Sequence, residues 1–144
     1  MRLTVLLMLV INAQAMADVP SSNASKVDLD QMQGSWQAIA MERDGLKIPE
    51  DDAQALFRTV KGNEYTVYRY DQAVGKGTFQ IDATKKPKTI DAAPAKGKPM
   101  LGIYEINGNI FKVCFAMPGQ MRPTDFTTAE DSGRTVTIWE REKK

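Results

Sequence analysis

Apolar and polar residues alternate along much of the chain, and the alternation is clearest over residues 100–118. Asn107-Gly108 separates two apolar-rich runs there, and both residues tolerate the positive φ that a two-residue type I′ turn requires. The segment therefore predicts a β-hairpin. Because side chains alternate between the two faces of a strand, this turn places Tyr104 opposite Phe111 on a buried face.

Short runs rich in β-branched and aromatic residues recur on both sides of this hairpin, and no long helical pattern competes with them. Besides the two hairpin arms, strands are predicted over residues 35–43, 56–61, 64–70, 74–82, 88–92, 124–127 and 134–141. Helical signals are confined to one turn over residues 28–33, which could plug one end of a barrel, and one near residues 48–56. About eight or nine short strands joined as sequential hairpins predict an all-β fold, a small up-and-down antiparallel barrel of about eight strands.

The first residues resemble a secretion signal. A basic residue precedes an apolar stretch over residues 3–11 that is too short to span a bilayer, and small residues follow it. Cleavage after Ala17 removes a signal peptide (1–17) and leaves a polar, flexible leader (18–26) before a folded domain (27–144). We therefore expect a secreted or periplasmic protein without stable membrane insertion after cleavage; a retained membrane anchor is the alternative.

Charge is balanced along the chain, which has 19 Lys and Arg residues against 18 Asp and Glu residues. No net field therefore favours nucleic acid or an anionic membrane, and we predict no nucleic-acid partner. A local lysine cluster is interpreted as a solvated face, with an anion-binding rim as the alternative. Its members are Lys85, Lys86, Lys88, Lys96 and Lys98.

The chain has no histidine and a single cysteine, Cys114. The absence of histidine excludes Ser-His-Asp and Cys-His catalysis and histidine-based metal sites. Cys114 has no partner for an intrachain disulfide, and its place on a strand predicts a small buried hydrophobe. We predict no metal, no cofactor and no catalytic residue.

Five motifs resemble a known family. Gly34-Ser35-Trp36 is similar to the Gly-x-Trp signature of the lipocalins, in which the tryptophan closes the barrel floor beneath a basic residue of the last strand; Arg141 or Arg134 would supply that residue here. The other four motifs are Glu42-Arg43-Asp44-Gly45, Lys86-Pro87-Lys88-Thr89-Ile90-Asp91, Leu101-Gly102-Ile103-Tyr104-Glu105 and Arg122-Pro123-Thr124-Asp125-Phe126. Together they resemble the lipocalin-like domain family of planctomycetes and related bacteria. The resemblance implies the barrel fold and no particular substrate.

An eight-stranded barrel either fills its interior with side chains or holds one small ligand, and the sequence allows both. The residues predicted to bind a ligand are Trp36, Tyr65 or Tyr68, Phe79, Tyr104, Phe111 and Phe115, together with Arg122. For Arg122, which precedes a proline, a structural lock of its loop is the other interpretation.

The pattern favours a non-catalytic, exported and monomeric barrel that binds a small apolar or amphipathic ligand. One alternative is a hydrolase using two of the carboxylates Asp91, Glu105 and Asp125, because carboxylates about 5–9 Å apart can cleave a glycoside. The other is a protein–protein interaction module with a filled barrel and an exposed apolar patch. The residues of such a patch would be Leu101, Ile103 and Ile110.

Overall fold

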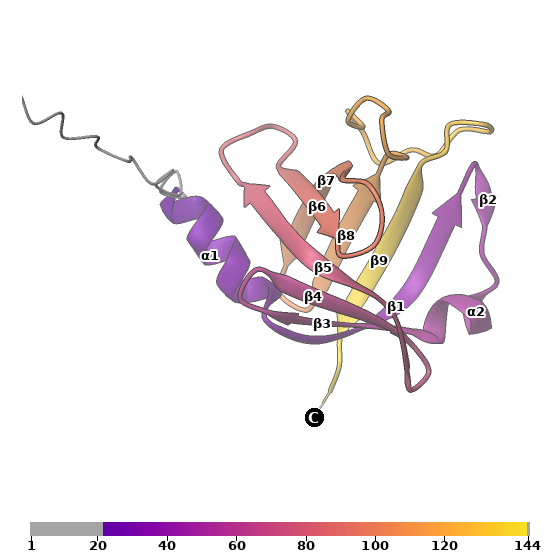
Figure 1. Ribbon diagram of the computed structural model, residues 1–144, viewed down its shortest axis with the longest axis horizontal. Helices are drawn as coiled ribbons and strands as arrows, with labels where there is room; N and C mark the ends of the chain where they lie inside the picture. The colour runs from indigo at the N-terminus through magenta and orange to yellow at the C-terminus, as the bar shows by residue number, and fades with distance from the viewer. Residues whose placement is uncertain (1–21, 144) are drawn as a thin grey trace, which may run out of the picture.

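The structure, a computed structural model, describes residues 22–143 (Figure 1). Its helices are α1 (Asn23–Met32) and α2 (Glu50–Gln54), and its strands are β1 (Gly34–Arg43), β2 (Leu46–Lys47), β3 (Leu56–Lys61), β4 (Glu64–Arg69), β5 (Gln72–Asp82), β6 (Thr89–Pro94), β7 (Met100–Asn107), β8 (Ile110–Phe115) and β9 (Thr135–Arg141). The predicted signal peptide over residues 1–17 lies outside the described residues.

Eight strands form a closed antiparallel barrel. β1 pairs with β3, each later strand pairs with the next as far as β9, and β9 pairs back with β1. β2 is a short additional strand hydrogen-bonded to the end of β1. In Figure 1 the yellow β9 lies beside the indigo-to-violet β1, where the sheet closes. The predicted small up-and-down barrel of about eight strands is confirmed.

Helix α1 covers one end of the barrel, next to β5 and β7 (Figure 1). The indole Nε1 of Trp36 donates to the carbonyl of Met32 at 2.9 Å, and both side chains are fully buried. The guanidinium of Arg141 lies 4.3 Å from the centre of the Trp36 ring and donates to the carbonyls of Gln31 and Gln33. Arg141, and not Arg134, is thus the basic residue above the tryptophan. We call this end the floor and the opposite end the mouth.

Helix α1 is longer than the single turn predicted over residues 28–33. It begins at Asn23, where the Ser22 hydroxyl accepts from the amide of Ser25, so residues 23–26 of the predicted leader are helical. The buried Asp28 carboxylate accepts from Lys88 Nζ and from Tyr104 Oη, both at 2.8 Å. These contacts with the barrel stabilise a helix whose own sequence has little amphipathic pattern.

The central hairpin forms, but its register differs from the prediction. Asn107 pairs with Ile110, so the two turn residues are Gly108 and Asn109, and of these only Gly108 has positive φ (59°). That pattern matches a type II′ turn, with glycine at its first central position. Tyr104 consequently pairs with Val113 rather than Phe111. Because the shift is two residues, every side chain keeps its predicted face.

A smaller apolar cluster covers the outside of the barrel. Ile103, Cys114 and Val136 are buried there beneath Phe126, which belongs to the segment joining β8 to β9. The residues predicted as strand 124–127 form no strand and instead supply this cover. The exposed patch predicted from Leu101, Ile103 and Ile110 is therefore wrong, since the Ile103 side chain is fully buried.

Replacing Arg141 tests the closure of the floor. Arg141→Met removes the cation–π contact with Trp36 and leaves two backbone carbonyls of α1 without their donor. We expect the free energy of unfolding to fall by about 2–4 kcal/mol, measured by urea denaturation. Arg69→Met is the matched control. Arg69 is half-exposed, and its ion pair with Asp52 is long, at 3.8 Å, so the substitution should change the free energy of unfolding by less than about 1 kcal/mol. Equal effects of the two substitutions would contradict the assignment.

The reactivity of Cys114 tests the outer cluster. Burial raises the pKa of its thiol, so the folded protein presents little thiolate. We expect an aromatic disulfide reagent to modify Cys114 at least about 1000-fold more slowly in the folded protein than in denaturant, and Phe126→Ala to accelerate the reaction several-fold. A folded protein that reacts at the denatured rate would show that the cover is open.

Candidate functional site

The barrel interior contains most of the predicted ligand-binding residues. One core cluster includes Trp36, Tyr65, Phe79, Tyr104, Phe111 and Phe115. Phe111 lies at its centre, with ring centroids 5.8 Å from Trp36 and 6.4 Å from Tyr104. Tyr68 is the exception: it pairs with Phe57, which faces outward beside the inward Arg58. The choice between Tyr65 and Tyr68 is therefore resolved in favour of Tyr65 as the interior residue.

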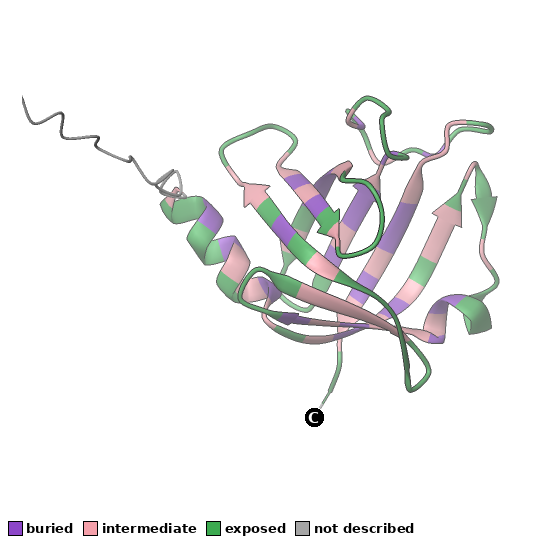
Figure 2. Ribbon diagram, in the orientation of Figure 1, coloured by how far each residue is buried: buried purple, intermediate pink, exposed green. Residues whose placement is uncertain are grey.

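Burial of the inner wall varies from strand to strand. Trp36, Tyr104 and Phe111 are fully buried, whereas the inward Leu56 and Val67 are only partly buried. In Figure 2 most buried residues lie on the strands and some on α1 and α2, while the β4–β5 turn and most loops are exposed.

At the floor end the inward Tyr65, Ile81 and Ile106 are also only partly buried. Ala92 and Val113, nearer the mouth, are buried, so partial exposure is found at both ends of the inner wall.

Gly75 enlarges the mouth. It pairs with Val67 across β4 and β5 and so shares the inner face, and no atom lies within 4 Å of where its Cβ would be. Its backbone is not in the left-handed region, so a side chain would fit there without strain. The space next to Val67 is therefore unfilled because the residue is glycine.

Arg58 lies on the inner face of β3, between Leu56 toward the mouth and Val60 toward the floor. It is 4% exposed, and its guanidinium carbon lies 5.0 Å, 5.5 Å and 5.4 Å from the ring centres of Tyr65, Phe79 and Phe111. No carboxylate within residues 22–143 forms an ion pair with it, and its buried Nε has no hydrogen-bond partner there. The interior thus holds an uncompensated positive charge among aromatic rings.

Burial sets the ionisation of this group. Desolvation lowers the pKa of Arg58 to about 10, and the neighbouring Tyr65 opposes that shift. The pKa of Tyr65 is raised, because burial outweighs the favourable effect of the Arg58 charge. At neutral pH the interior therefore combines a guanidinium cation with a neutral phenol.

A second unpartnered donor belongs to the same interior. Trp139 on β9 is 4% exposed, and its Nε1 has no hydrogen-bond partner among the described residues. Trp139 pairs with Phe111 across β8 and β9, and Arg58 contacts the Phe111 ring. Arg58 and Trp139 are therefore both neighbours of Phe111, and each has a buried donor without an acceptor among residues 22–143.

Arg122 lies outside the interior cluster. Its Nη1 donates to the carbonyl of Gly102 at 2.8 Å and lies 2.6 Å from Oδ1 of Asp91, which faces outward between the inward Ile90 and Ala92. The adjoining Pro123 is fully buried. Arg122 thus fastens the β8–β9 segment to the barrel wall, in agreement with the structural-lock interpretation.

The strand register separates two of the candidate carboxylates, Asp91 and Glu105. Asp91 pairs with Leu101, four residues from Glu105 along β7, which corresponds to about 13 Å. Asp125 accepts from Thr127, lies 3.6 Å from Arg134, and has a lowered pKa chiefly because of those hydrogen bonds with Thr127. Asp91 and Glu105 therefore lie beyond the 5–9 Å separation of a glycosidase pair.

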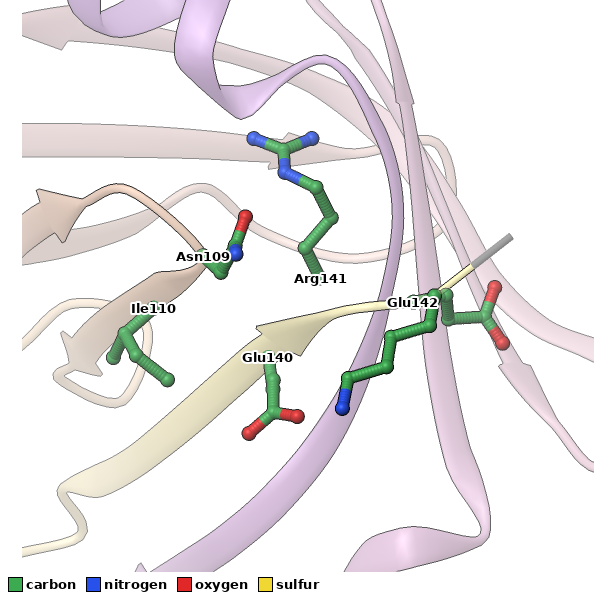
Figure 3. A pocket seen from close by; sticks show the side chains of 6 residues that line it. Asn109, Ile110, Glu140, Arg141 and Glu142 are labelled. Atoms are coloured by element: carbon green, nitrogen blue, oxygen red, sulfur yellow. The ribbon is translucent and has the colours of Figure 1, made fainter.

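Two surface depressions lie outside the barrel. One is lined by Asn109, Ile110 and the end of β9 with the residues after it, and Figure 3 shows the Arg141 side chain there reaching toward α1. The other lies along β1 and β9, beside Lys47 and Ile48. Neither is lined by the interior aromatic residues.

Comparisons of the chain with family models, curated proteins and solved structures found no match. In the described part of the chain, no cluster of three or more acidic or cysteine side chains could hold a metal ion, and neither helix has the length and apolarity needed to cross a bilayer. The side chains inside the barrel are therefore the features that indicate a function.

Sequence reasoning missed Arg58 and Trp139 as interior groups. The signal for Arg58 was present, because Leu56, Arg58 and Val60 are alternate residues of one predicted strand and share its apolar face. A charged residue on such a face predicts either an ion pair inside or a bound counter-charge.

Substituting Arg58 in the ligand-free protein tests whether its charge is uncompensated. Arg58→Met keeps much of the side-chain volume and removes the energetic cost of burying a guanidinium. It also removes the cation–π contacts with the three rings. We expect the free energy of unfolding to stay the same or rise by up to about 3 kcal/mol. A fall of more than about 1 kcal/mol in urea denaturation would show that the cation stabilises the empty barrel.

Proposed function

We propose that the protein is an exported, lipocalin-like binding protein that holds a small apolar or amphipathic molecule inside its barrel and is not an enzyme. The observation that carries the proposal is a closed barrel with an inward aromatic cluster, beside which the inward Leu56 and Val67 are only partly buried and Gly75 leaves open space. Concave apolar sites with a few polar groups are the usual form of small-molecule sites. Export rests on the sequence of residues 1–17.

Exposed apolar side chains at the mouth support this function. Most of the large hydrophobic residues that are exposed in the described part of the chain belong to β2, to the β4–β5 turn and the start of β5, or to the β8–β9 segment, all of which lie at the mouth end. They are Leu46, Tyr70, Val74, Met117 and Met121. An apolar rim favours the approach of an apolar ligand.

Filling the mouth tests the proposal. Gly75→Phe places a ring in the open space beside Val67, and Lys76→Phe places the same ring on the outer face, opposite Thr66. We expect a neutral fluorescent probe such as Nile red to bind the wild type and Lys76→Phe, and its affinity for Gly75→Phe to fall at least about tenfold. Both variants should keep the wild-type melting temperature within a few degrees.

Two results would contradict this function. If no neutral probe binds the wild type, the barrel is a filled scaffold. If Gly75→Phe and Lys76→Phe bind the probe equally well, the probe occupies the outer surface and not the interior.

A further inference from the structure

The cationic side chains near the aromatic core differ in whether they have hydrogen-bond or ion-pair partners. Arg141 stacks on Trp36 and donates to two backbone carbonyls, and Lys88 is paired with Asp28 above the Tyr104 ring. Arg58 is more deeply buried than either and has neither a carbonyl nor a carboxylate partner in residues 22–143. Of these three cations, Arg58 therefore has no acceptor or counter-charge from the described part of the chain.

Aromatic rings do not replace the missing partner. Each cation–π contact contributes about 0.5–2 kcal/mol, whereas removing a lone ion from water costs several kcal/mol. The ring faces also form no hydrogen bond with Nε of Arg58, which remains unsatisfied. An acceptor that carries a negative charge would supply both missing interactions at once.

The indole N–H of Trp139 indicates what kind of acceptor would fit beside Arg58. Nε1 of Trp139 is also buried and without an acceptor, and the two residues both adjoin Phe111. A group with two acceptor oxygens and one negative charge matches a guanidinium and an indole N–H. A carboxylate has this composition.

We propose that the ligand of this barrel is an amphipathic carboxylate whose head group binds Arg58 and Trp139 while its apolar body extends toward Leu56 and Val67 at the mouth. The inference rests on the proposed function and adds the ligand's charge and orientation. It explains why the unpaired cation lies where the wall changes from partly exposed Leu56 to buried Val60. In this orientation the head group enters first and binds the guanidinium of Arg58, between Leu56 and Val60.

The test compares two ligands that differ in the head group alone. Decanoic acid and 1-decanol share the same apolar body, so their affinities, measured by displacement of Nile red at neutral pH, isolate the effect of the charge. We expect the wild type to bind decanoate about 10- to 100-fold more tightly than decanol, the range that a charge-assisted hydrogen bond provides. Trp139→Phe should reduce that preference several-fold.

Arg58→Met should abolish the preference for decanoate over decanol. Lys61→Met is the matched control, because Lys61 is an exposed cation on the same strand, and it should keep the full preference. Arg58→Lys, which keeps the charge but not the planar donors, should retain part of it.

The outcomes separate this inference from the function on which it rests. Equal binding of decanoate and decanol by the wild type overturns the carboxylate and leaves the binding function intact. A preference that survives in Arg58→Met, or that Lys61→Met also loses, overturns the role of Arg58. If the probe binds but neither amphiphile displaces it, the carboxylate is overturned and the binding function stands. If no probe binds, both proposals fail. The wild-type comparison decides this even if a variant does not fold.

Discussion

The contact between the first and last strands of the barrel is the constraint on which the interior depends. Without the pairing of β1 with β9 the sheet would have two open edges and no enclosed face. Trp36 and Arg141 complete this closure at the floor, where Arg141 donates to a carbonyl 108 residues earlier in the chain. Such a distant contact is entropically costly to form, so the buried indole, the cation and the helix that covers them act together to stabilise it.

The two ends of the barrel are built from different side chains. The floor uses large aromatic side chains packed at centroid distances of about 6 Å, together with a helix held through the buried Asp28. The mouth has glycine at position 75 and half-buried aliphatic residues, and it therefore contributes less apolar burial to stability. Near Gly75 the inner wall could therefore accept a larger side chain or a ligand without loss of a packed contact.

Alternation in the sequence predicts the barrel and the inward aromatic residues because period two is a local property. The register of the central hairpin was not predictable in the same way, since Asn107, Gly108 and Asn109 offer two competing two-residue turns. Helix α1 begins earlier than expected because contacts of Ser25 and Asp28 with distant residues stabilise it. Such contacts form only in the folded barrel, so the local sequence pattern does not predict them.

The same limit explains what the sequence conveys about Arg58. Its position on an apolar strand face is local information. The lack of a carboxylate partner for it among residues 22–143 depends on eight strands meeting around one axis. The penalty for removing its guanidinium from water is already incurred when the empty protein folds. An incoming carboxylate therefore loses only its own hydration and meets a cation that is fixed and dehydrated, so the binding free energy is larger than an exposed arginine could provide.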